Sequence, residues 1–188
     1  MFLHTNDMCG RYRIDTNYRD MSDIYQILTD DNNPHFVCDI YPSNQAPVFT
    51  SDSLLPTFCK WGLEMFDKKL LINVRAETVT EKPMFYKHFT QARCVIPCNG
   101  FYEWDSNKNK FYFTRADGKL LYLCGFCKIT NGVKSFTILT KHATAPVAQF
   151  HHRMPVIVDE TDKSNYLLNT NYATNFITQN SDIGLQIT

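Results

Sequence analysis

The stretch RCVIPCNGFYEW, residues 93–104, decides the fold class of this chain. It contains two short runs rich in β-branched and aromatic residues, Arg93–Pro97 and Gly100–Trp104, and such runs are typical of strands. Three further runs of this kind follow it: Lys110–Arg115, Leu120–Ile129 and Lys134–Thr140. The segments 107–109 and 116–118 have the composition of hairpin turns, so we predict neighbouring antiparallel strands.

Shorter strands and a few helices are predicted on either side of this β-rich centre. The clearest helix spans residues 18–30, where Met21, Ile24, Ile27 and Leu28 fall on one face. Other helical segments are expected at 82–91, 144–150 and 161–168, and other strands at 36–41, 47–50, 70–74 and 154–158. We therefore predict an α+β fold: a single compact domain with a mostly antiparallel, barrel-like sheet and a few short flanking helices.

Length and composition fit a globular protein of one domain. The chain has 188 residues, 44% of them hydrophobic, and it contains no repeat or Gly/Ser linker. No run reaches the ~18 apolar residues of a membrane-spanning helix. The first residues, MFLHTND, lack the features of a signal peptide, so we expect a cytoplasmic location. Basic and acidic residues balance at 19 each, which argues against a non-specific nucleic-acid coat protein but leaves room for a local basic groove.

The seven cysteines are expected to be reduced, because they are odd in number and spread along a chain without an export signal. Two close pairs, Cys94 with Cys98 and Cys124 with Cys127, raise the alternative of a zinc site with thiolate ligands. Both pairs lie in apolar strand-like runs rather than in the tight turn of a zinc knuckle. We therefore predict small buried apolar residues there, with no metal and no cofactor.

A reactive group is predicted at Met8-Cys9-Gly10-Arg11-Tyr12. If synthesis began at Met8, or if the preceding segment were removed, Cys9 would carry a free α-amino group beside its thiol. Such a 1,2-aminothiol condenses with an aldehyde, because the amine forms an imine and the thiol then closes a thiazolidine ring. The two groups titrate near pH ~8 and ~8.5, so both are nucleophilic around neutrality. The alternative is a cysteine that is simply buried near a chain end.

Two further segments place polar groups beside apolar strands. In NVRAE, residues 73–77, the Asn73 amide can hydrogen-bond a carbonyl-like group and the Arg75 fork can hold a phosphate. The alternative there is a strand-to-helix turn capped by its own polar residues. In FHHRMP, residues 150–155, one histidine can move protons near pH 7. Adjacent histidines in an extended chain point to opposite sides, so at most one is expected to reach the reactive cysteine, and a solvent-exposed pair is the alternative.

A third segment, NGFYEW at residues 99–104, sets a carboxyl among aromatic rings. Desolvation by such neighbours raises the pKa of a carboxyl toward neutrality, which would make Glu103 a general acid or base. Strand alternation places Tyr102 and Trp104 on the face opposite Glu103, so an outward-facing glutamate remains the alternative.

Taken in order, these segments resemble the SRAP family, the SOS response-associated peptidase proteins, which sense abasic sites in single-stranded DNA. The family motifs stand here at Met8–Arg11, Trp61–Leu63, Asn73–Glu77, Gly100–Trp104 and His151–Pro155. The resemblance extends from residue 8 to residue 168. It implies a compact α+β fold with a positively charged groove for single-stranded DNA. It also implies a monomer that acts in the DNA damage response, at the nucleoid or replication fork in a bacterium.

The resemblance implies a role for each motif residue. The Cys9 α-amine would form an imine with the aldehyde of an abasic site, and its thiol would close a thiazolidine that links DNA to protein. Glu103 would assist ring opening, Asn73 would position the amino terminus or the sugar oxygen, and His151 would move protons. Autopeptidase and AP-lyase activities are implied as well. The DNA-contacting set would be Arg11, Trp61, Arg75, Glu77, Trp104 and Arg153, with arginines holding phosphates and tryptophans stacking on bases.

Two features depart from the family pattern. Seven residues precede Met8, and Cys9 has no free amine while they are attached. We therefore expect residues 1–7 to be absent from or cleaved in the mature protein, and residues 8–188 to form the SRAP-like domain. The stretch from Leu63 to Leu70 is also short for the family, so some DNA contacts are expected to be missing.

Two other classes of protein fit the same residues. A cysteine-nucleophile amidohydrolase or self-processing peptidase would use His151 as a base and Asn73 in an oxyanion hole. A non-covalent single-stranded DNA-binding module would bind without help from Cys9, and its affinity would depend strongly on salt.

Overall fold

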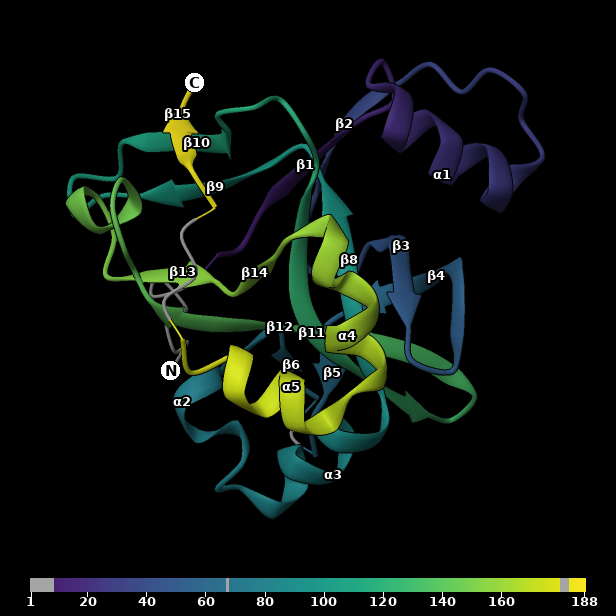
Figure 1. Ribbon diagram of the computed structural model, residues 1–188, viewed down its shortest axis with the longest axis vertical. Coiled ribbons are helices and arrows are strands. Elements are labelled where there is room, and N and C mark those ends of the chain that lie inside the picture. Colours follow the sequence, from purple (N-terminus) through teal and green to yellow (C-terminus); the bar gives the residue numbers. More distant parts are fainter. Residues whose placement is uncertain (1–8, 67, 180–182) are drawn as a thin grey trace.

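Five strands form a closed barrel at the centre of the molecule. The computed structural model describes residues 9–66, 68–179 and 183–188 (Figure 1). The barrel strands are β3 (Gln45–Thr50), β4 (Ser53–Trp61), β8 (Arg93–Cys98), β11 (Leu121–Thr130) and β12 (Val133–His142). They pair in the order β12–β4–β3–β8–β11, and β11 pairs with β12 again. All neighbours are antiparallel except β12 and β4, which pair in parallel.

A second sheet of five antiparallel strands lies beside the barrel (Figure 1). Its strands, in sheet order, are β15 (Leu185–Ile187), β10 (Lys110–Arg115), β9 (Gly100–Trp104), β1 (Tyr12–Asp15) and β2 (Val37–Ile40). β9 follows β8 after a single residue, Asn99. The Asn99 side chain fixes this junction, because its Oδ1 accepts a hydrogen bond from the Asp15 backbone N–H at 2.7 Å.

Short strands extend the barrel on one edge. β7 (Asn73–Arg75) pairs with β12 in parallel, and β13 (Arg153–Pro155) pairs with β12 in the antiparallel sense. Thr140 of β12 is the register partner of both Arg75 and Pro155. The hairpin of β5 (Leu63–Glu64) and β6 (Leu70–Leu71) lies between β4 and β7 in the chain, and β14 (Ile157–Val158) pairs with β11. This edge therefore gathers chain segments that are far apart in sequence.

The helices are short and lie around the sheets. They are α1 (Arg19–Thr29), α2 (Ala76–Val79), α3 (Pro83–Gln91), α4 (Lys163–Leu168), α5 (Thr170–Phe176) and the 3₁₀ turns η1 (Val147–Gln149) and η2 (Glu160–Asp162). α1 buries Met21, Ile24 and Tyr25, whereas Ile27, expected on the apolar face, is exposed. α1 ends at Asp30, whose left-handed φ of 56° stops the helical path. No helix in the described part of the chain is long and apolar enough to cross a membrane.

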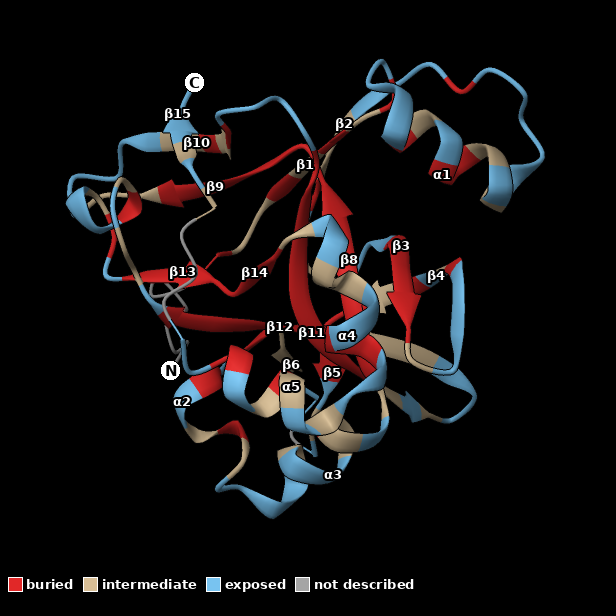
Figure 2. Ribbon diagram, in the orientation of Figure 1, coloured by how far each residue is buried: buried red, intermediate tan, exposed pale blue. Residues whose placement is uncertain are grey.

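The core runs through the barrel and the inner face of the second sheet, as the buried strands in Figure 2 show. Trp61 lies at its centre: its ring stacks on Phe136 with 5° between the planes, and it meets Tyr12 at 5.2 Å between ring centroids. The indole N–H donates to the Ile72 carbonyl at 3.0 Å. The cysteines at 94, 98, 124 and 127 are all buried free thiols, as predicted for small apolar residues.

The predicted fold class is confirmed. The strands predicted at 100–104 and 110–115 have those bounds in the structure, and the helices predicted at 18–30 and 82–91 are α1 and α3. Other regions differ from expectation. The helix predicted at 144–150 is only the 3₁₀ turn η1, and the sequence did not predict the barrel strand β4 or, near the C-terminus, α5 and β15. α5 begins at Asn169, whose side chain accepts a hydrogen bond from the Tyr172 N–H at 3.0 Å.

Candidate active site around Cys9

Cys9 lies three residues before the start of β1 and is completely buried. Its thiol faces the Arg11 carbonyl, with 3.7 Å between Sγ and the oxygen. Its own carbonyl oxygen accepts a hydrogen bond of 2.9 Å from Nδ2 of Asn73. Met8 and the predicted extension 1–7 lie outside the described residues. Cys9 is therefore held from both sides by polar contacts rather than packed only against apolar groups.

Asn73 reaches Cys9 because of the parallel pairing of β7 with β12. This pairing sets Asn73 opposite Ile138 and makes it the first residue of β7, at the edge of the barrel. The side chain is buried, and within the described residues its Oδ1 has no hydrogen-bond partner. A buried amide with a free acceptor can take a hydrogen bond from an amine or a sugar hydroxyl placed beside Cys9.

Glu103 of β9 points into the protein and is only 2% exposed. Its strand neighbours Tyr102 and Trp104 point to the other face, as alternation requires. The inward direction of Glu103 therefore excludes the alternative of an outward-facing glutamate. Burial raises the pKa of the Glu103 carboxyl well above its ordinary value. Its Oε1 is buried without a hydrogen-bond partner in the described part of the chain. A carboxyl in this setting keeps its proton to a higher pH than a solvated carboxyl does, so it is suited to donate a proton.

His151 follows η1 and brings an imidazole to Glu103. Its Nδ1 lies 3.7 Å from Oε2 of Glu103, 2.8 Å from the Arg153 carbonyl oxygen and 3.1 Å from the Arg153 backbone nitrogen. The neighbouring His152 is exposed. Only one histidine of the pair therefore joins the site, and that one is buried next to a carboxyl.

The Glu103 carboxyl lies near enough to the Cys9 thiol to affect its pKa. Burial raises the pKa of the Cys9 thiol well above its ordinary value, and the nearby charge of Glu103 raises it further, whereas the Arg11 backbone hydrogen bond opposes the rise. The resting thiol is therefore protonated. One cluster thus brings together Cys9 from the segment before β1, Asn73 from β7, Glu103 from β9 and His151 from the segment before β13.

Arg11 lies on the face of the second sheet opposite Glu103, among aromatic rings. Its guanidinium carbon is 4.6 Å from the ring centroid of Tyr41 and 5.3 Å from that of Trp104. Tyr102 lies at 5.6 Å, and Asp39 approaches within 3.7 Å. These cation–π contacts fix the orientation of the guanidinium, and the Arg11 side chain remains 25% exposed. The pairing of β1 with β2 assembles this group, and Asp39 of β2 and Tyr41, which follows β2, had no signal in the sequence.

Arg75 is exposed at the end of β7, where it is the N-cap residue of α2. It lies two residues from Asn73, so strand alternation directs both side chains to the same side of β7. An exposed guanidinium beside the buried amide is suitably placed for a phosphate next to the site.

Three members of the expected DNA-contacting set have other surroundings. Trp61 is fully buried in the core, so a base can reach its ring only if the barrel opens. Arg153 is also buried, and its guanidinium bonds both carboxylate oxygens of Glu77 at 2.7 and 2.9 Å. Trp61 therefore belongs to the core, and the buried Arg153 is paired with Glu77, whose own side chain is 38% exposed.

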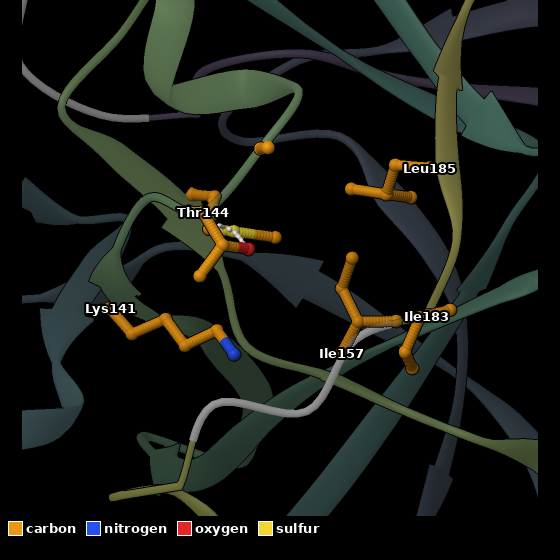
Figure 3. Close-up of a pocket in the computed structure, with 7 residues that line it drawn as sticks. Lys141, Thr144, Ile157, Ile183 and Leu185 are labelled. Atoms are coloured by element: carbon orange, nitrogen blue, oxygen red, sulfur yellow. Dashed lines mark hydrogen bonds between the residues drawn. The ribbon is translucent and has the colours of Figure 1, made fainter.

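The structure also contains a small cavity (Figure 3). It is lined by Lys141, Thr144, Ala145, Met154, Ile157, Ile183 and Leu185. Its volume is about 10 Å³, which is room for about one water molecule. None of the four clustered residues lines it, so the candidate chemistry does not belong to this cavity. Among the residues that the structure describes, no group of three or more His, Cys, Asp and Glu side chains is placed to hold a metal ion.

The sequence has relatives among characterised families. It matches the family model described as SOS response associated peptidase over residues 8–182. The abasic site processing protein YobE of Bacillus subtilis is 28% identical over 191 residues, covering 85% of this chain and 82% of YobE. The abasic site processing protein of Saccharomyces cerevisiae is 26% identical over 138 residues, which is 66% of this chain. This chain spans only 38% of that yeast protein.

Solved structures share the fold. A Bordetella bronchiseptica protein superposes with a TM-score of 0.75 at 20% identity, over 95% of this chain and 98% of that chain. A Bacteroides thetaiotaomicron protein gives a TM-score of 0.73, also at 20% identity, over 95% of this chain and 90% of that chain. The likeness concerns the fold, whereas the family follows from the sequence match, which covers nearly the whole chain. The chain belongs to the SOS response associated peptidase (SRAP) family.

Proposed function

We propose that this protein captures abasic sites in single-stranded DNA by forming a covalent link through Cys9. The two relatives compared above are named abasic site processing proteins. The observation that carries the proposal is the convergence of Cys9 with a buried amide, a buried carboxyl and a buried imidazole from three other parts of the chain. Stability alone does not favour so many desolvated polar groups around one thiol, whereas chemistry does.

The reacting form is the one in which Cys9 is the first residue. An abasic site exposes the deoxyribose aldehyde when its sugar ring opens, and the protonated carboxyl of Glu103 is the acid for this opening. The Cys9 α-amine attacks the aldehyde carbon, and an imine forms as one water leaves. The Cys9 thiol then adds to the imine carbon while a proton is delivered to the imine nitrogen, with His151 moving the proton. The product is a thiazolidine.

Asn73 prepares the amine for attack. Its Nδ2 already holds the Cys9 carbonyl at 2.9 Å, which fixes the direction of the Cys9 backbone. Its free Oδ1 can accept a hydrogen bond from the α-amine or from the open sugar. Restricting the amine in this way reduces the entropy that is lost when the amine is positioned to attack the aldehyde.

The imine stage allows a side reaction that the thiol suppresses. An imine makes the proton on the adjacent sugar carbon acidic, and a base such as His151 can remove it with loss of the 3′ phosphate. This would be an AP-lyase activity. Ring closure by the Cys9 thiol consumes the imine, so a Cys9→Ser protein, which keeps the amine, is expected to cut more DNA and to retain less.

DNA approaches over the surface next to Cys9. Arg11 and Trp104 form a cation–aromatic pair on the outer face of the second sheet, and Arg75 is exposed near Asn73. Guanidinium groups hold phosphates, and flat side chains accept unstacked bases. Few cations suffice when one covalent bond provides retention, so a net charge of zero is compatible with this function.

A cysteine-nucleophile hydrolase fits the site less well. An attacking thiol needs a lowered pKa or an adjacent base. Burial and Glu103 instead raise the pKa of the Cys9 thiol, and the thiol hydrogen-bonds a backbone carbonyl, that of Arg11. In the proposed reaction the amine attacks first and the thiol adds afterwards, so the thiol need not be ionised in the resting protein. Removal of residues 1–8 is then a maturation step that exposes the amine.

The proposal is tested with two proteins, the full chain and a form that begins at Cys9, incubated with single-stranded DNA that contains one abasic site. The form beginning at Cys9 is expected to give a denaturation-resistant adduct. DNA with a tetrahydrofuran analogue, which has no aldehyde, is expected to give none. An adduct that persists in Cys9→Ala would refute the proposal. A processed full chain that never forms an adduct would favour the peptidase, and binding without lesion preference would favour a non-covalent DNA-binding module.

A further inference from the structure

An ion pair between the buried Arg153 and the partly exposed Glu77 lies next to His151 in the structure. Arg153 opens β13, and its side chain is 3% exposed. Its Nη1 and Nη2 donate to Oε1 and Oε2 of Glu77 at 2.7 and 2.9 Å, in the bidentate geometry that makes such pairs strong. Glu77 is in the first turn of α2, directly after β7. The pair therefore joins β13 to the chain segment that carries Asn73.

Two hydrogen bonds extend this ion pair to β12. Nη2 of Arg153 donates to the Thr140 carbonyl at 2.7 Å, and the His142 backbone N–H donates to Oε1 of Glu77 at 3.1 Å. Burial alone would raise the pKa of the Glu77 carboxyl, but the hydrogen bonds from Arg153 prevail and lower it to about 2. The pair is therefore ionised throughout the neutral range, and it fixes β7, β12 and β13 relative to one another.

The position of Arg153 determines the position of the His151 ring. Nδ1 of His151 lies 2.8 Å from the Arg153 carbonyl oxygen and 3.1 Å from the Arg153 backbone nitrogen. When protonated, Nδ1 can donate to the Arg153 carbonyl oxygen, and when unprotonated it can accept from the Arg153 backbone N–H. Both backbone groups belong to the residue whose side chain Glu77 holds. The remaining titratable neighbours of the ring are Glu103 at 3.7 Å and His152, whose ring centroid is 4.7 Å away.

We propose that Glu77 is a positioning residue for His151, acting through the Arg153 guanidinium and backbone to hold the imidazole beside Glu103. The inference rests on the proposed function, because it assigns a support to the residue that moves protons there. It replaces the expectation that Glu77 and Arg153 contact DNA. A carboxylate at a DNA surface would repel phosphates, so its removal would tighten DNA binding, whereas the positioning role predicts no change in binding.

The decisive variant is Glu77→Gln, which keeps the side-chain length and one acceptor oxygen but removes the charge and the second oxygen. Glu81→Gln is the matched control. Glu81 lies shortly after α2 and is exposed, and this substitution changes the net charge by the same amount. Adduct formation by Glu77→Gln is expected to slow by about tenfold to a hundredfold, as when the support of a functional histidine is removed. Its affinity for tetrahydrofuran-containing DNA is expected to stay unchanged, and Glu81→Gln is expected to react like the unaltered protein.

A readout without DNA separates this role from a general structural one. Long-range ¹H–¹⁵N spectra of the histidine rings, assigned with a His151→Gln protein, report the protonation and tautomer of His151. Glu77→Gln is expected to move the ¹⁵N resonances of His151 and to alter the pH dependence of adduct formation. If the protein fails to fold, Arg153→Lys offers the same test, because lysine keeps the charge but lacks the fork.

Three results would overturn the inference: unchanged reaction rates in Glu77→Gln, unchanged His151 resonances, or tighter DNA binding with a steeper salt dependence. The last would mean that Glu77 faces DNA. Failure of the proposed function itself is distinguishable, because the unaltered protein would then form no adduct while the His151 spectra still report on the ion pair.

Discussion

The Glu103 carboxyl shows at the scale of one residue how function and stability oppose each other. It is 2% exposed, its Oε1 finds no hydrogen-bond partner in the described ranges, and burial raises its pKa. In the unfolded chain the same carboxyl titrates near pH ~4.3. Between that pH and the raised folded value, the unfolded state releases a proton that the folded state retains. Folding is therefore penalised increasingly as pH rises through this interval.

Glu103→Gln is expected to stabilise the protein at neutral pH and to slow adduct formation. The amide cannot ionise, so the penalty disappears; it also cannot donate a carboxyl proton. We expect Tm at pH 7.5 to rise by about 2–4 °C, the shift that ~1 kcal/mol produces in a chain of this size. Thermal unfolding followed at pH 4 and pH 7.5 is the measurement. A gain that is largest at pH 4, or a loss at pH 7.5, would contradict the assignment of a buried neutral acid.

Arg11→Gln is expected to weaken DNA binding without affecting the aldehyde chemistry. Loss of one phosphate contact reduces the slope of log K against log salt by about 0.7 for single-stranded DNA. Fluorescence anisotropy at several salt concentrations measures this slope, and reaction with a small free aldehyde measures the chemistry. Arg19→Gln is the control, because the Arg19 side chain is 92% exposed on α1, away from the aromatic group. Equal effects of both substitutions would show that only net charge matters.

At the scale of elements, β9 is the strand on which the site depends. Its inner face presents Glu103, and its outer face presents Tyr102 and Trp104 to Arg11. Its first residue, Gly100, allows β10 to approach closely: a Cβ there would lie 2.5 Å from the Phe113 carbonyl oxygen and 2.6 Å from the Tyr112 ring. The spacing between β9 and β10 therefore depends on glycine, with no Cβ, at position 100.

Gly100→Ala is expected to destabilise the fold because the added methyl group meets a backbone carbonyl that cannot move alone. Overpacking of this kind costs about 1–3 kcal/mol. Chemical denaturation of Gly100→Ala measures the cost. Gly118→Ala is a suitable comparison, since no atom lies within 4 Å of the position of its Cβ, although its φ of 75° adds backbone strain. A Gly100→Ala protein as stable as the original would show that the two strands are less tightly fixed than the structure indicates.

At the scale of the whole molecule, the sequence predicts local elements well and their assembly poorly. Gly100–Trp104 and Lys110–Arg115 are bounded by turn residues, so their limits could be predicted. β4 was not recognised, because its first residues are exposed and its last ones buried, which obscures the alternation. Closure of the barrel depends on parallel pairing between β12 and β4, a contact between residues far apart in the chain that no local pattern encodes.

The same distinction applies to the candidate site. The motifs contain Cys9 and the three residues that meet around it, because each motif is local. The surroundings of Trp61 and Arg153 could not be predicted, because burial follows from how β4, β12 and β13 assemble. A tryptophan in a motif suits a base platform and a core equally well, and only its neighbours Tyr12 and Phe136 decide between them.

The most direct test of the account is intact-protein mass spectrometry of the form that begins at Cys9, after reaction with single-stranded DNA bearing one abasic site. The account predicts an adduct with the mass of protein plus DNA less one water, resistant to borohydride because the imine has been closed, and absent from Cys9→Ala. An adduct that appears only after borohydride trapping, or one that survives in Cys9→Ala, would contradict thiazolidine formation at Cys9.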